Sequence, residues 1–165
     1  MVTRVLLVTG ARSRPDDPAA EAWARGKIAA ALVGVDLLLV GDASGPDAWA
    51  WDEGANLALV PWAFYTRGNG AGWIVTERNG VRSRTERWAP PGVAVHPLDR
   101  NAAMVATARA NMLRGHTVSV LALLDGRKPA VVKPGEKRPT RGTEHTARLA
   151  RAAGLTVDAQ TWGSR

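Results

Sequence analysis

The chain has 165 residues, of which 45% are hydrophobic and 22% charged, proportions that suit one globular domain with a sizeable core. It contains no cysteine, which excludes disulfides, thiolate zinc sites and cysteine nucleophiles. Its 22 Lys and Arg against 15 Asp and Glu give a net charge of +7, which favours anionic partners such as nucleotides, phosphates or nucleic acid. No stretch reaches the ~20 apolar residues of a membrane span, and no signal peptide is visible. We therefore expect a soluble, cytoplasmic protein with no membrane partner.

Strand-like and helix-like segments alternate along the chain. The pattern predicts a buried strand over residues 4–9, an amphipathic helix over 18–33 and a second buried strand over 35–40. A second helix is expected over residues 46–56, with Pro46 in its first turn, followed by a short strand over 57–61. After an interruption come a helix over 100–113, a strand over 116–124, a helix over 144–153 and a final strand over 155–157.

Continuously apolar strands separated by helices are typical of parallel strands that are covered on both faces. The predicted fold class is therefore α/β: a Rossmann-like three-layer sandwich with a mostly parallel central sheet, formed by residues 1–165 as a single domain. Residues 66–97 interrupt the repeat as an insertion. Within it, Asn79-Gly80 separates two β-prone runs, residues 73–78 and 81–88, which is a strong signal for a β-hairpin.

A second irregular segment, residues 127–141, contains six basic residues, one glutamate and three prolines, and we expect a loop there. It is one of three polar turns that follow predicted strands. In an open parallel sheet, ligands bind beyond the carboxyl ends of the strands. Two of the turns lead directly into helix N-termini, whose unpaired amide groups and dipole attract anions.

These turns supply most of the candidate ligand-binding residues. Gly41 and Gly45 would let the backbone approach a phosphate or ribose, Ser44 would cap the helix or donate to an oxygen, and Asp47 would hold a ribose hydroxyl. The alternative is that Ser44 and Asp47 only cap a helix, in a turn that needs glycine. The candidates from the three turns are Thr9, Gly10, Arg12, Ser13, Gly41, Asp42, Ser44, Gly45, Asp47, Arg141, Gly142 and Thr143.

Several short motifs occur in order along the chain. They are Val8-Thr9-Gly10-Ala11-Arg12, the segment from Gly41 to Ala50, Arg100-Asn101-Ala102-Ala103-Met104, and Gly142-Thr143-Glu144-His145-Thr146. In these motifs the chain resembles the SLOG superfamily, Rossmann-like nucleotide-binding domains related to DprA-type and LOG-type proteins. It is most similar to the YspA-like branch found in bacteria and phages. The resemblance implies a nucleotide or nucleotide-derived ligand and adds Arg100 and Asn101 to the ligand-binding candidates.

The sequence departs from that pattern at two positions of consequence. Asp42 replaces a glycine and would repel a phosphate placed directly against it. LOG-type relatives are phosphoribohydrolases with a glutamate where this chain has Thr146, and a threonine cannot supply that carboxylate. We therefore expect a binding protein that senses or sequesters its ligand. The alternative is a nucleotide-processing hydrolase that acts on an N-glycosidic or phosphate bond.

Other partners and cofactors receive less support. The three histidines lack metal-ligand spacing, so neither a metal nor another cofactor is expected. Nucleic acid is a weaker alternative ligand, because the basic loop at 127–141 has no interleaved aromatic residues for stacking. A homodimer is expected, since the tryptophan-bearing hairpin needs a covering surface.

Overall fold

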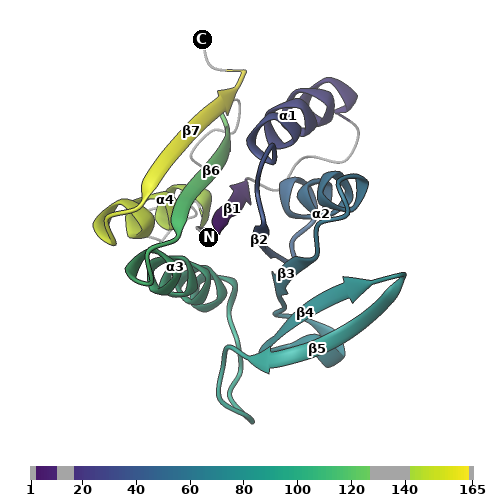
Figure 1. Cartoon of the computed structure of the whole chain (residues 1–165), viewed down its shortest axis with the longest axis vertical. Helices are drawn as coiled ribbons and strands as arrows, with labels where there is room; N and C mark the ends of the chain where they lie inside the picture. The colour runs from purple at the N-terminus through teal and green to yellow at the C-terminus, as the bar shows by residue number, and fades with distance from the viewer. Residues whose placement is uncertain (1–2, 11–16, 127–141, 164–165) are drawn as a thin grey trace, which may run out of the picture.

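The structure is a computed structural model in which residues 3–10, 17–126 and 142–163 are described. Its centre is a seven-stranded sheet with the order β5-β4-β3-β2-β1-β6-β7 (Figure 1). Five strands run parallel to one another: β1 (Arg4–Gly10), β2 (Leu37–Gly41), β3 (Pro61–Phe64), β6 (Thr117–Asp125) and β7 (Thr156–Trp162). The hairpin of β4 (Trp73–Arg78) and β5 (Val81–Arg87) joins β3 in antiparallel orientation.

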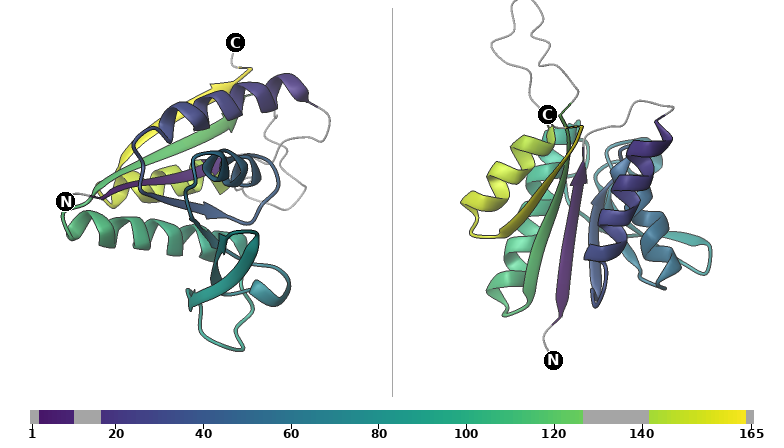
Figure 2. Two further views of the ribbon diagram at one scale, coloured as in Figure 1. Left: turned by 45° about the vertical axis from the view of Figure 1, so that its right-hand side comes forward. Right: turned by 90° about the horizontal axis from the view of Figure 1, so that it is seen from above.

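Helices cover both faces of the sheet, as Figure 2 shows in the view from above. One layer contains α1 (Pro18–Ala31) and α2 (Pro46–Asn56), and the other contains α3 (Pro97–Leu113) and α4 (Gly142–Ala152). Because neighbouring side chains on a strand point to opposite faces, Leu6 and Val8 of β1 enter the core under α1, while Val5 and Leu7 enter the core under α3 and α4. The predicted α/β fold with a mostly parallel, doubly covered sheet is confirmed.

The order of strands places a switch of direction at β1. The chain moves outward through β2 and β3, and α3 then returns it to β6 on the other side of β1. In open α/β sheets, such a reversal opens a crevice at the carboxyl ends of the strands. The ends of β1 and β2, at Gly10 and Gly41, lie at that edge.

The third strand was predicted too early in the chain. Instead of extending over residues 57–61, β3 begins at Pro61. Leu57 and Ala58 belong to the end of α2, where Ala58 has a positive φ of 57° and the Leu59 amide donates to the Gly54 carbonyl. The turn that ends the helix uses residues whose apolar side chains resemble a strand, and Leu57 is exposed.

Two further boundaries differ from the prediction by three residues or more, and the others by at most two. The last strand runs to Trp162 rather than residue 157, and it pairs along its whole length with β6. Its sequence is half polar because it is an edge strand. Helix α3 begins at Pro97 rather than residue 100, with His96 and Asp99 forming a capping box at its start.

The predicted hairpin is confirmed. Asn79 and Gly80 both have positive φ, 51° and 77°, which matches the right-handed twist of the two strands that they join. The segment 66–97 thus adds two strands to the edge of the central sheet, and a short 3₁₀ turn, Gly68–Gly70, precedes them. In the described part of the chain, no helix is long and apolar enough to cross a membrane.

Candidate functional site

Close backbone approaches bring the predicted turns together. A Cβ at Gly10 would lie 2.3 Å from the Cβ of Pro46, so the end of β1 packs directly on the start of α2. A Cβ at Gly41 would lie 2.6 Å from the Asp47 carboxylate and 2.9 Å from the Arg100 guanidinium carbon. The Pro46 ring leaves no room for a side chain at residue 10, and a side chain at residue 41 would displace the Asp47 carboxylate and the Arg100 guanidinium.

Asp42, directly after β2, lies at the centre of a buried polar cluster. Its carboxylate accepts hydrogen bonds from the Thr66 amide at 2.8 Å, the Thr66 hydroxyl at 3.0 Å and Arg100 Nη1 at 2.7 Å. The Asp42 and Arg100 side chains are only 4% and 7% exposed. The Asp42 carboxylate is thus neutralised inside the protein, which removes the repulsion expected from the sequence.

The hydrogen bonds decide the protonation state of Asp42. Burial acts to raise its pKa, because a charged group loses solvation. The Thr66 amide, Arg100 and the Thr66 hydroxyl favour the ionised form, and together they lower the pKa of Asp42 below its usual value. Asp42 is therefore an anion at neutral pH and acts as an internal partner for arginine.

Arg100 and Asn101 point into this cluster from the first turns of α3. Asn101 Oδ1 accepts from Arg100 Nε at 3.1 Å and Nη2 at 3.0 Å, so the guanidinium is held between Asn101 and Asp42. Both residues are buried. A Cβ at Gly142 would be 3.7 Å from Asn101 Nδ2, which places the start of α4 beside the same cluster. The motifs around residues 42, 100 and 142 are therefore adjacent in space.

Arg67 is a site residue that sequence reasoning missed. It donates from Nη2 to the Asp42 carbonyl, and its Nε is 3.6 Å from Asp42 Oδ2. Its side chain is 72% exposed, so this guanidinium faces solvent at the edge where the candidate residues gather. The signal was hidden because Arg67 lies in the insertion, 25 residues after its partner.

The turn before α2 differs in detail from the prediction. Ser44 is exposed and does not cap the helix: the N-cap is Gly45, and no side chain caps α2. Gly45 has φ 87° and ψ −133°, a conformation open essentially to glycine alone. Asp47 is buried, and its carboxylate accepts from the Ala43 amide at 3.1 Å, which closes the turn. Asp47 thus holds the loop after β2 rather than capping the helix.

At the start of α4, Thr143 and Thr146 are both buried. The Thr146 hydroxyl donates to the Gly142 carbonyl at 2.8 Å, so this side chain is engaged within its own helix. Thr9 is also buried, on the same face of β1 as Leu7, toward α3 and α4. Arg12, Ser13, Arg141 and the basic loop that ends at 141 lie outside the described residues.

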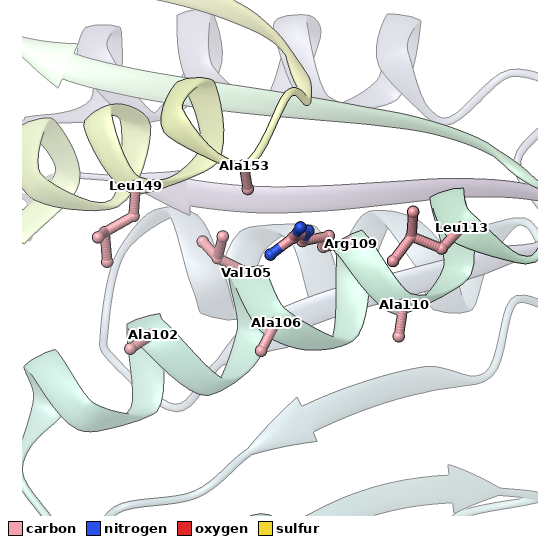
Figure 3. A pocket seen from close by; sticks show the side chains of 8 residues that line it. All are labelled: Ala102, Val105, Ala106, Arg109, Ala110, Leu113, Leu149 and Ala153. Carbon is pink, nitrogen blue, oxygen red and sulfur yellow. The ribbon is translucent and has the colours of Figure 1, made fainter.

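Elsewhere in the described chain, a metal site or a groove could also offer a place where a ligand binds. Within residues 3–10, 17–126 and 142–163, no three His, Asp or Glu side chains are grouped so that they could hold a metal ion. A groove of about 380 Å³ between α3 and α4 is lined mainly by alanines and leucines, with Arg109 on one wall (Figure 3). None of the candidate ligand-binding residues lines that groove.

Comparison with protein families finds none that matches the chain, and no curated protein matches it. Among solved structures, the chain is similar to DNA processing protein A (DprA) from Streptococcus pneumoniae, with 15% sequence identity and a TM-score of 0.39. The similarity covers 95% of this chain and 58% of that chain, so this chain spans little more than half the length of that protein. A similarity this weak carries no conclusion about function.

Proposed function

We propose that the protein binds a nucleotide or nucleotide-derived small molecule at the carboxyl edge of β1, β2 and β6. The observation that carries this proposal is the distribution of charge around Asp42. The carboxylates of Asp42 and Asp47 are buried and accept hydrogen bonds from the protein. The guanidinium of Arg67 is exposed. An approaching anion therefore meets a positive group, although two aspartates lie close by.

The start of α2 supports the same location for an anion. Because Gly45 has no side chain, the first amide groups of the helix have no capping partner from that residue. In contrast to α2, helices α1 and α3 have side-chain caps: Asp17 and His96 accept hydrogen bonds from amides of their first turns. The uncapped helix end at Gly45 lies three residues after Asp42, and Arg67 contacts Asp42. Both groups attract a phosphate.

The buried candidates have a supporting role in this proposal. Arg100 and Asn101 use their polar groups on each other and on Asp42, so they hold the loop after β2 in place for the ligand. The adjacency of the motifs at 42, 100 and 142 fits one shared site, as the resemblance to the SLOG superfamily implies, and we propose membership of that superfamily. The YspA-like branch, the cytoplasmic location and the homodimer stay predictions.

Binding without turnover is the form of the function that these residues support. A hydrolase needs a carboxylate or another base exposed to the ligand. Asp42 and Asp47 are engaged by protein donors, and Thr146 donates to its own helix. No observation favours hydrolysis over binding, and we therefore propose a sensing or sequestering role.

Isothermal titration calorimetry with AMP, ADP, ATP and ADP-ribose tests this proposal, together with mass spectrometry of any ligand released from the purified protein. Arg67→Ala should weaken binding of the best ligand about 10- to 100-fold, because a hydrogen bond to a charged group contributes about 1.5–3 kcal/mol. Arg114→Ala is the matched control. Arg114 is also exposed, but it follows α3 and lies near the start of β6, at the amino-terminal ends of the parallel strands. Its loss should therefore leave affinity unchanged.

Two results would contradict the proposal. One is the absence of binding for all four compounds at millimolar concentration, with no ligand released from the purified protein. The other is an equal loss of affinity in the Arg67 and Arg114 variants, which would reflect net charge alone. Release of free base or phosphate during the titration would support the alternative function, a nucleotide-processing hydrolase.

A further inference from the structure

The β4–β5 hairpin gathers three arginines on one of its faces. The register pairs Glu77 with Arg82, Val75 with Arg84 and Trp73 with Arg87. Residues three apart on a regular strand point to opposite faces. The register shifts between Ile74 and Val75, opposite Thr85, and this bulge turns Arg87 to the same face as Arg84.

Tryptophan rings hold these arginines in place. The guanidinium carbons of Arg84 and Arg87 lie 5.1 Å and 4.9 Å from the ring centre of Trp73. Arg82 lies 5.3 Å from the ring centre of Trp51, which comes from α2. A cation over an indole ring is attracted by the ring's negative face. These contacts fix long side chains that would otherwise be mobile, so less conformational freedom is lost when they bind a partner.

The positive charge of this face is largely uncompensated. Arg82 lies 3.6 Å from Glu77 and its side chain remains 61% exposed. Arg84 and Arg87 donate to the backbone carbonyls of Asn69 and Ala89, and no carboxylate of the described residues lies within ion-pair distance of either. All seven residues of β5 are exposed, and β5 is the outermost strand of the sheet (Figure 1). With five arginines and two glutamates, residues 66–97 have a net charge of +3.

We propose that this arginine–tryptophan face of the hairpin, defined by Arg82, Arg84, Arg87, Trp51 and Trp73, binds the phosphodiester backbone of a nucleic acid. Alternate residues on a strand are about 6.6–6.8 Å apart, close to the separation of successive phosphates along one nucleic acid strand. Guanidinium groups bind phosphate with two parallel hydrogen bonds. The guanidinium faces that do not contact an indole ring also provide flat platforms on which bases stack.

Charge complementarity favours this partner over a second copy of the chain. Two copies joined through β5 would bring like-charged arginines together, and charged side chains on an edge strand disfavour strand pairing. The arginine–tryptophan face uses none of the residues to which the nucleotide site around Asp42 is assigned. Nucleic acid binding can therefore hold or fail independently of nucleotide binding.

Fluorescence anisotropy of the full chain with labelled oligothymidylate, oligouridylate and a short DNA duplex tests the proposal at salt concentrations from about 50 to 200 mM. We expect at least one of the three probes to bind, with affinity that falls as salt rises. The double variant Arg84→Gln/Arg87→Gln should lose about tenfold in affinity at low salt. For a single strand, its slope of log affinity against log salt should become less negative by about 1.4, since each phosphate contact contributes about 0.7.

The matched control is Arg109→Gln/Arg114→Gln, which makes the same change in net charge at exposed positions on α3, across the sheet from the hairpin face. It should change affinity less than twofold. Hydrogen exchange of the wild-type chain supplies a test that does not depend on the folding of a variant. Addition of the oligonucleotide that binds best should slow exchange over residues 73–87.

Four results would overturn the proposal. They are no binding of any probe by the wild type, equal losses in the two double variants, protection confined to other parts of the chain, and equally tight binding of polyglutamate. The last result would show a general attraction for polyanions, such as an acidic protein, rather than for a nucleic acid. Preference among the three probes identifies the form of nucleic acid.

Discussion

Replacing Asp42 by asparagine tests the buried cluster at the centre of the candidate site. Asparagine has almost the same shape, but it is neutral and one of its two oxygens becomes an NH₂ group. The Asp42 carboxylate receives three hydrogen bonds, two from Thr66 and one from Arg100, and both charged side chains are less than a tenth exposed. The variant leaves Arg100 buried without its counter-ion. It also places the NH₂ group of asparagine against a donor of Thr66 or Arg100.

The expected cost at pH 7 is about 3 kcal/mol of the free energy of unfolding. Removing one partner of a buried ion pair costs about 3–5 kcal/mol, and asparagine retains part of the hydrogen bonding. The effect depends on pH, because the pKa of Asp42 is lower in the folded protein than its unfolded value of 3.8. A lowered folded pKa gives stabilisation that is complete above the unfolded pKa and is lost as pH falls through the folded pKa. The difference between wild type and variant should therefore shrink below about pH 4.

Urea unfolding followed by tryptophan fluorescence at a series of pH values measures this difference, and the matched control is Asp52→Asn. Asp52 pairs with Arg25 at 3.1 Å, but its side chain is 59% exposed, so its loss should cost less than about 1 kcal/mol. The reasoning is refuted if the two variants cost the same. It is also refuted if the cost of Asp42→Asn is constant from pH 7 to below pH 4.

The same unfolding assay checks two predictions about glycines. Gly10→Ala should cost about 1–3 kcal/mol, because the new Cβ would overlap the rigid ring of Pro46. Its control, Gly26→Ala, has open space in the middle of α1 and should stabilise the protein by about 0.5–1 kcal/mol; a stable Gly10 variant would contradict the packing of β1 on α2. Gly80→Ala also has open space, so its cost of about 1–2 kcal/mol should come only from the positive φ of 77°. An unchanged midpoint would show that the hairpin turn relaxes freely.

Local sequence patterns were sufficient to locate the elements whose structure depends mainly on residues close by in the chain. The period of the apolar residues located the helices and the buried strands β1, β2 and β6, and Asn79-Gly80 located the hairpin turn. The same reasoning failed at Leu57, whose apolar side chain belongs to a helix end, and along β7, whose polar residues pair with β6 at the edge of the sheet. In both places, contacts with another segment outweigh the local preference.

The candidate site shows the same division. The turns at Gly10, Gly41 and Gly142 pack against neighbouring elements of the same region, because parallel strands bring their carboxyl ends to one edge. The pairing of Asp42 with Arg100 joins residues 58 apart, and no spacing rule reveals it. The contact of Arg67 with Asp42 was also invisible, since it depends on how two distant loops pack. The bulge that aligns Arg84 with Arg87 depends on the register of the inserted strands.

By itself, then, the sequence determined the α/β class, the alternation of strands and helices, and the edge at which polar turns collect, because all of these follow from short-range periodicity and turn chemistry. Only the tertiary structure decided which charges are buried against each other and which face solvent. The physical reason is that the cost or benefit of a charge depends on its distance from partners and on its access to water. Both are properties of the folded arrangement, in which Asp42 becomes an internal partner and Arg67 an outward-facing cation.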